Sequence, residues 1–325
     1  MATTNKSTRQ QQHWPDTEFF VEVPGARLHC VARGAGPVLL LIPGGALDAG
    51  IYTPLARLLA DRRCVVTYDP RGNSRSTLRG AAGPQDVDVH GDDAARVLAA
   101  IGDSLPTARL SRAARTTADQ VGVFGSSGGA QIGLNLAARY PASLGVLVAH
   151  EPPCSRLLED PAPDMEVEAR VVAAYRTGGV AAAMQAFMAE TGLAETPRSS
   201  EEHVRPVSDE ERDTRRRTNE NLPSFFEHGM LTLSGYIPDV RTLRAGAPRV
   251  IVAVGSDSAG QPIDRSTRAL AHHLNTEVLV FPGDHLGYAS HAASFAELLH
   301  HCLMNAIQLA DDAANSSTVP VAQES

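Results

Sequence analysis

Lysine is almost absent from this chain, and cysteine is scarce. Lys6 is the only lysine, which leaves no lysine to carry out chemistry in the core. The four cysteines, Cys30, Cys64, Cys154 and Cys302, are far apart and form no C-x-x-C pair. This spacing disfavours a disulfide framework or a zinc site and predicts buried, reduced thiols. We therefore expect neither a metal nor a disulfide.

The sequence also lacks an excess of positive charge and any apolar run of membrane-spanning length. The net charge of −8 argues against a general attraction to nucleic acid or to an anionic membrane. The N-terminus is polar and has no apolar segment of the kind found in secretory signals. We expect a cytoplasmic protein with a small-molecule substrate and no nucleic-acid or membrane partner. The sequence leaves a homodimer open.

Strands and helices alternate along most of the chain. Strands are predicted at residues 17–23, 27–32, 37–42, 64–68, 121–124, 144–149, 249–254 and 277–281, and helices at 51–60, 86–101, 127–139, 265–274 and 292–307. This order predicts an α/β fold, a doubly wound and mostly parallel sheet built from residues 17–154 and 241–310. Disordered tails are expected over residues 1–16 and 311–325.

The pattern changes between residues 155 and 240, where strands stop and charged helices take over. Helices are predicted at 165–175, 180–188, 209–220 and 223–233, which together would form a helical cap inserted into the core. Within it, residues 215–217 are three consecutive arginines among glutamates, a pattern typical of a solvated helix face with local ion pairs.

The centre of the sequence is a G-x-S-x-G motif between a predicted strand and a predicted helix. Gly125 and Gly129 lie on either side of Ser127 in this motif. A side chain at either glycine would collide with the backbone across so tight a turn. The turn would expose the Ser127 hydroxyl at the top of the sheet and at a helix N-terminus, where a developing negative charge is favoured. Ser127 is therefore the candidate nucleophile.

A serine nucleophile needs a base, a group that orients the base, and donors for the oxyanion. These parts come from loops at the carboxyl ends of strands. His285 follows the last predicted strand after a turn and is the candidate base among twelve histidines. The N–H groups of Gly128 and Gly45 are the candidate oxyanion donors, and Gly44 lies in the same loop as Gly45.

The orienting acid has two candidates. Asp257 follows the seventh predicted strand and Glu151 follows the sixth, and these strand ends are neighbours. Either carboxylate would reach the imidazole of His285. Burial at the end of so apolar a strand requires a partner for the Glu151 carboxylate, which favours Glu151 slightly.

These motifs together resemble the α/β-hydrolase superfamily over about residues 19 to 305. The resemblance rests on four segments, Pro43-Gly44-Gly45, Asp69-Pro70-Arg71-Gly72-x-Ser74-x-Ser76, the turn from Gly125 to Gly129, and the segment from Phe281 to His285. Two departures stand out. Pro43 replaces a histidine common in the family, and Ser258 occupies the usual place of the acid, one residue after Asp257. Some members carry the acid after strand six, where this chain has Glu151.

The resemblance and the residues together predict a serine hydrolase that cleaves an ester, a lactone or a related acyl bond without a cofactor. Two alternatives stay open. The first is an enzyme that uses the same residues for other chemistry, namely a cofactor-free perhydrolase, a C–C hydrolase or a tailoring enzyme of secondary metabolism. The second is a non-catalytic small-molecule binding protein of this fold. Phe225 and His228 are candidate substrate contacts. Other apolar cap residues would either line a pocket or pack onto the core; they are Met184, Phe187, Met188, Phe226, Met230 and Tyr236.

Overall fold

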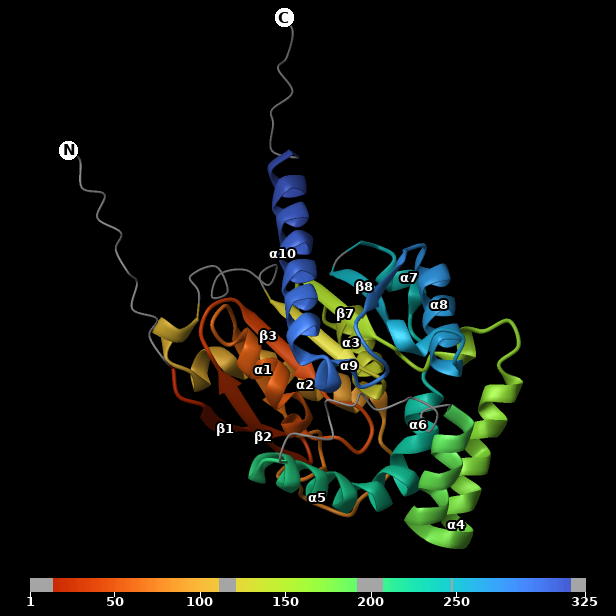
Figure 1. Ribbon diagram of the computed structural model, residues 1–325. Coiled ribbons are helices and arrows are strands. Elements are labelled where there is room, and N and C mark those ends of the chain that lie inside the picture. The colour runs from red at the N-terminus through yellow and green to blue at the C-terminus, as the bar shows by residue number, and fades with distance from the viewer. Residues whose placement is uncertain (1–13, 111–120, 192–206, 247, 317–325) are drawn as a thin grey trace, which may run out of the picture.

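The computed structural model describes residues 14–110, 121–191, 207–246 and 248–316, and one nine-stranded sheet lies at its centre (Figure 1). The strands follow the order β1-β2-β4-β3-β6-β7-β8-β9, and β5 pairs with β2. β1, β2 and β4 are antiparallel neighbours, whereas all pairs from β4 to β9 are parallel. The strands are β1 (Thr17–Val23), β2 (Ala26–Arg33), β3 (Val38–Ile42), β4 (Cys64–Tyr68), β5 (Thr77–Leu78), β6 (Gly122–Ser126), β7 (Val146–His150), β8 (Arg249–Gly255) and β9 (Val278–Phe281).

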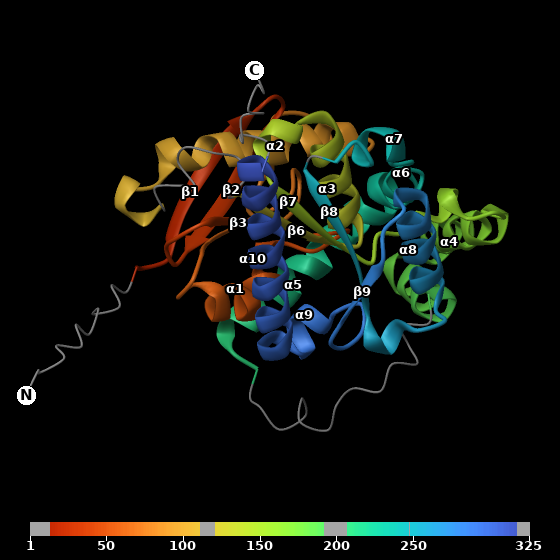
Figure 2. The same ribbon diagram turned by 90° about the horizontal axis from the view of Figure 1, so that it is seen from above.

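Helices cover both faces of the sheet, which confirms the predicted doubly wound architecture. Figure 2 shows α2 and α3 on one side of the strands and α1 and α10 on the other. The strand β3 shows why both faces are covered, since Leu40 belongs to one apolar cluster and Leu39 to the opposite one. The helices of this core are α1 (Thr53–Leu59), α2 (Val87–Ser104), α3 (Gly128–Arg139), α7 (Val240–Leu243), α8 (Pro262–Leu274), α9 (Gly287–Ser290) and α10 (Ala292–Ser316).

Three further helices lie between β7 and β8 in the chain and gather on one side of the sheet (Figure 1). They are α4 (Ala162–Thr191), α5 (Asp209–Ser224) and α6 (Met230–Ser234), and a π-helical turn over Phe225–Gly229 joins α5 to α6. These helices form an apolar cluster of their own around Val171, Ala183 and Phe226. We call them the helical insertion. The cap limits of 155 and 240 remain a prediction.

The helices of the insertion agree with the predicted ones in one place and differ in another. Two helices were expected at 165–175 and 180–188, and α4 consists of two helical segments that meet at Gly179, whose backbone is not helical (φ 69°, ψ −163°). A helix start was expected at Pro223, but α5 continues through this proline to Ser224. Proline usually ends or kinks a helix because its nitrogen donates no hydrogen bond. Here the π-helical turn begins two residues later.

The remaining expectations concern the connection over residues 102–118, the cysteines and the tails. Residues 111–120, most of both tails, and residues 192–206 and 247 lie outside the described part. In the connection, the buried Arg109 donates hydrogen bonds to the carbonyls of Gly34 and Ala32, which ties this segment to the end of β2. All four cysteines are free and buried, as predicted. None of the described helices is long and apolar enough to cross a bilayer.

Candidate active site

Ser127 stands at the sharp turn from β6 into α3. Its φ of 58° and ψ of −129° form a left-handed backbone that few residues other than glycine adopt. A Cβ atom on Gly125 would lie 2.2 Å from the carbonyl oxygen of Gly129, and one on Gly129 would lie 2.1 Å from the oxygen of Ile42. Both positions therefore require glycine, as the motif predicted. The turn places Ser127 at the N-cap of α3.

The loop after β3 packs directly against this turn. A Cβ atom on Gly44 would lie 2.6 Å from the Ser126 oxygen and 2.9 Å from the Gly128 nitrogen, so only glycine permits this approach. A Cβ position built on Gly128 lies 3.3 Å from the Gly45 nitrogen, which shows that the two backbones face each other. Gly128 begins α3, so helix geometry leaves its N–H without an acceptor in the helix.

Two asparagines hold the carbonyl groups of the loop after β3. The Asn73 amide donates hydrogen bonds to the Gly45 and Leu47 carbonyls, each at 3.2 Å. The Asn221 amide, which comes from α5, donates to the Ala46 carbonyl at 2.9 Å. Because these hydrogen bonds hold the carbonyl groups of the loop, the N–H groups of the loop keep their orientation. The helical insertion thus contacts the loop that carries Gly45.

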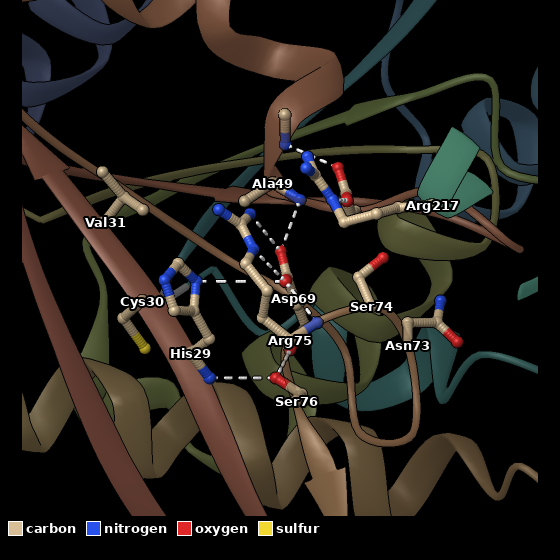
Figure 3. Close-up of polar contacts among 12 residues, drawn as sticks. His29, Cys30, Val31, Ala49, Asp69, Asn73, Ser74, Arg75, Ser76 and Arg217 are labelled. Atoms are coloured by element: carbon tan, nitrogen blue, oxygen red, sulfur yellow. Dashed lines mark hydrogen bonds and ion pairs between the residues drawn. The ribbon is translucent and has the colours of Figure 1, made fainter. Parts of the chain in front are cut away.

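A buried carboxylate, Asp69, fixes the next part of this loop (Figure 3). It accepts hydrogen bonds from the Ala49 N–H at 3.0 Å and from the Arg75 guanidinium at 2.8 and 2.9 Å. Close to Ala49 in Figure 3, the Arg217 side chain of α5 forms an ion pair with the buried Asp48. The Asp69 segment therefore supports the loop, and does not contribute a reacting group itself.

His285 and Glu151 are joined by a short hydrogen bond. His285 Nδ1 lies 2.6 Å from Glu151 Oε2, and Glu151 Oε1 accepts a second hydrogen bond from the Gly255 N–H at 2.8 Å. An ionised carboxylate only accepts hydrogen bonds, so Nδ1 of the imidazole carries the shared proton. The other ring nitrogen, Nε2, is then free to accept a proton.

The electrostatics of Glu151 favour its ionised form. Burial acts to raise the pKa of this fully buried carboxyl, but the hydrogen bond and charge interaction with His285 outweigh it and lower the pKa to about 2. The neighbouring His150 is also fully buried, and its ring packs against Phe124 and Phe295. Burial lowers the pKa of His150 to about 4, so this imidazole is neutral and structural.

The structure separates the two candidate acids. Asp257 is exposed on a short helical turn after β8, and its carboxylate accepts a hydrogen bond from the Ser256 hydroxyl at 2.9 Å. His285 donates its hydrogen bond to Glu151 instead. The strand order alone does not explain this, because β8 lies between β7 and β9. The Asp257 carboxylate is instead exposed and bonded to Ser256, whereas Glu151 is buried beside His285.

Ser127 and His285 line the same cavity, which has a volume of about 140 Å³. Gly45, Gly128 and Phe225 also line it, and their roles as oxyanion donors or substrate contacts remain predictions. Phe225 lies 3.4 Å from a Cβ position on Gly45, so its ring borders the oxyanion loop. The apolar lining further includes Val167, Phe187, Met230, Leu233 and Ile263.

One candidate contact does not line the cavity, and several lining residues were not singled out from the sequence. His228 is absent from the described lining, and its carbonyl accepts a hydrogen bond from the Gln85 N–H. Phe226, for which the sequence left both roles open, packs inside the helical insertion. The sequence analysis did not single out Gln131, Asp164 or Glu168, although all three line the cavity. The two acids had no distinctive signal, because charged residues are common on any helix.

Comparisons with known proteins agree with this architecture. A family model described as "Alpha/beta hydrolase family" matches residues 39–298. An uncharacterized hydrolase, YraK of Bacillus subtilis, is 33% identical over 293 residues, which cover 87% of this chain and 94% of that protein.

Two solved structures share the fold at low sequence identity. An esterase from Thermogutta terrifontis superposes with a TM-score of 0.67 at 20% identity, over 89% of this chain and 99% of the esterase. An enol-lactonase from Burkholderia xenovorans gives a TM-score of 0.61 at 18% identity, over 88% and 99% of the two chains.

Proposed function

The chain belongs to the α/β-hydrolase family, and we propose that it is a serine hydrolase that cleaves an ester, a lactone or a related acyl bond. The observation that carries the proposal is the 2.6 Å contact between His285 and Glu151 at a cavity that Ser127 also lines. Acyl transfer requires a nucleophile and a base whose tautomer is fixed. Ser127, in its strained turn, and His285, held by Glu151, have these properties at one cavity.

In the proposed mechanism, the Ser127 hydroxyl attacks the carbonyl carbon of the substrate. His285 Nε2 takes the hydroxyl proton as the bond forms, and Glu151 stabilises the imidazolium that results. The N–H groups of Gly45 and Gly128 donate hydrogen bonds to the oxyanion, and the N-terminus of α3 adds a favourable field.

The tetrahedral intermediate then collapses to an acyl-enzyme. The bond to the leaving group breaks, and His285 returns its proton to the departing alcohol. Water next attacks the acyl-enzyme with His285 again as the base, which releases the acid and restores Ser127. These steps use only the named side chains, the backbone N–H groups and water.

The cavity supports a small and largely apolar acyl or alcohol group. A volume of about 140 Å³ suits a group about the size of a benzene ring. Phe187, Phe225 and Met230 contribute apolar surface from the helical insertion. The names of the solved relatives, an esterase and an enol-lactonase, are consistent with this class of bond.

The test compares the wild type with Ser127→Ala on a panel of short-chain p-nitrophenyl esters and small lactones. The substitution removes the nucleophile, so we expect kcat/KM to fall by about 10³-fold or more. The wild type should also be labelled by a fluorophosphonate at Ser127, and the variant should not be. Esterase activity that survives in the variant would remove Ser127 from this role, and a wild type that neither reacts nor is labelled would favour a binding protein.

A further inference from the structure

The polar groups that line the cavity are mostly hydrogen-bond acceptors. The carboxyls of Asp164 and Glu168 both lie in its wall, one turn apart on α4. The buried Gln131 contributes a third acceptor, because its amide nitrogen donates to the Pro153 carbonyl while its Oε1 has no partner among the described residues. A molecule bound here meets more acceptor oxygens than free donors.

The hydroxyl donors in the wall are already used. Ser155 donates to Glu168 Oε1 at 3.4 Å, Ser234 donates to the Met230 carbonyl at 2.7 Å, and Ser266 donates to the Pro152 carbonyl at 3.2 Å. Each serine has a single hydroxyl proton, so none is left for a ligand. The N–H groups of Gly45 and Gly128 are needed for the oxyanion of the proposed reaction.

The two carboxyls differ in their partners. Asp164 lies 3.6 Å from the Arg265 guanidinium of α8. For Glu168, no cation lies within ion-pair distance in the part of the chain that the structure describes, and the nearby Arg156 is exposed and outside the cavity lining. Burial raises the pKa of Glu168 to about 7, against the opposing influence of neighbouring hydroxyls and Arg156. A half-buried carboxyl with no cation in direct contact is a site that a bound cation stabilises.

We propose that the substrate carries a basic nitrogen, and that Glu168 binds it as a specificity-determining residue in the wall of the cavity that Ser127 also lines. The claim rests on the proposed serine hydrolase function and deepens it. The ammonium group supplies both the N–H donors and the positive charge that this wall lacks, while Val167, Phe187 and Phe225 contact the apolar part of the molecule. The substrate class is therefore amine-bearing esters or related acyl compounds.

The experiment uses pairs of substrates with the same shape and different charge. One pair varies the acyl group, p-nitrophenyl 4-(dimethylamino)butanoate against p-nitrophenyl 5-methylhexanoate. The other varies the alcohol, 2-(dimethylamino)ethyl butanoate against 3-methylbutyl butanoate. In each pair the protonated amine replaces a carbon centre, so the ratio of kcat/KM values measures the preference for charge. Both halves of the ester are tested because either could reach Glu168.

The variants are Glu168→Gln and, as a matched control, Glu166→Gln. Glu166 lies on the same helix, is exposed and pairs with Arg170, so its substitution removes the same charge outside the cavity. In at least one pair we expect the wild type to prefer the amine, and Glu168→Gln to reduce that preference about tenfold or more. Glu166→Gln should leave the preference within twofold. Activity of Glu168→Gln on the neutral ester shows that the variant folds.

A second measurement needs only the wild type. The preference for the amine should rise about tenfold or more between pH 5.5 and pH 8 as Glu168 ionises. Asp164, Arg156, Arg265 and His285 are the other charged or titratable groups around the cavity, and the ratio within a pair cancels effects common to both esters, such as the protonation of His285.

Three results would count against the proposal in distinguishable ways. No preference for the amine, or a preference that Glu168→Gln leaves intact, would overturn the role of Glu168 while hydrolysis of the neutral esters still supported the proposed function. A ratio independent of pH would do the same. A wild type that cleaves none of the four esters and is not labelled at Ser127 would overturn the proposed function and this inference with it.

Discussion

Ser127 and Glu151 share an unusual backbone and a common position. Both have positive φ values, 58° and 47°, which is uncommon for residues other than glycine. The register of β6 and β7 pairs Ser126 with His150, so each residue follows directly after a paired strand end. Parallel strands end at the same edge of the sheet, which brings the two turns side by side. Such strain persists only where the surrounding structure holds it, as at many reaction centres.

Glu151→Gln tests which carboxylate orients His285. The amide keeps the shape of the side chain but presents no negative charge to the imidazolium, and its N–H groups disfavour the tautomer that leaves Nε2 free. We expect kcat for a p-nitrophenyl ester to fall by about 10²- to 10⁴-fold, with KM changed little. Steady-state kinetics at several pH values would measure it.

Asp257→Asn provides the matched control for this substitution. Asp257 is exposed and bonded to Ser256, so the variant should keep kcat within about twofold of the wild type. A large loss in Asp257→Asn beside a small one in Glu151→Gln would assign the orienting role to Asp257 instead.

The residues proposed to react were easier to recognise from the sequence than the residues that surround them. Ser127 and His285 were recognisable because turns of glycine mark both positions, and Glu151 because a carboxylate is unusual at the end of an apolar strand. Glu168 and Asn221 have no such mark. Their positions depend on how α4 and α5 pack over the sheet, which the spacing of residues along each helix does not determine.

At the scale of single elements, α5 is the part of the helical insertion that holds the core loops. Its Glu210 pairs with Arg57 of α1, its Arg217 with Asp48, and its Asn221 with the loop after β3. The sequence predicted a solvated face with local ion pairs for residues 215–217. This holds for Arg216, which pairs with Glu220 on the same helix, but not for Arg217, which reaches a fully buried carboxylate on the core.

The difference between the buried ion pair of Arg217 and the exposed ion pair of Arg216 can be tested by substituting each of these adjacent residues, as Arg217→Ala and Arg216→Ala. Arg217→Ala would leave the buried Asp48 charge without its partner, so we expect the free energy of unfolding to fall by about 3 kcal/mol. Arg216→Ala removes an exposed pair that water screens, and should change stability little. Urea unfolding followed by circular dichroism measures both. Equal effects would contradict the assignment of Arg217 as the anchor of α5.

At the scale of the whole molecule, the sheet and its two helical layers could be predicted, whereas the insertion could be predicted only in outline. Apolar runs such as Val38–Ile42 specify strands buried on both faces, and the structure places β3 at the sheet centre. The break of α4 at Gly179 agrees with the two helices that were predicted there, but the continuation of α5 through Pro223 and the π-helical turn could not be predicted, because proline normally ends a helix. Tertiary packing of the insertion overrides that local preference.

The fold also buries two histidines as neutral groups, which ties its stability to pH. Burial lowers the pKa of both His90 and His150 to about 4, from an ordinary value of 6.5. The unfolded chain therefore binds protons that the folded chain does not, and stability is lost as pH falls from about 6.5 toward 4. Glu168 acts in the opposite direction, since its raised pKa gives stability that is lost as pH rises through about 7. With two histidines against one glutamate, acid should destabilise the protein overall.

His90→Gln isolates one of these contributions. His90 Nε2 lies 2.7 Å from the Gln85 side-chain oxygen, and a glutamine amide keeps a donor at this position without an ionisable ring. The substitution should be most destabilising at pH 7 and above, and its cost relative to the wild type should shrink by about 2 kcal/mol between pH 7 and pH 5, because only the wild type loses stability by protonation of the unfolded imidazole. Urea unfolding of both proteins at four pH values measures this difference. A difference that stays constant with pH would show that His90 titrates alike in the folded and unfolded chains, and the acid sensitivity would then have to come from His150 or from the carboxylates.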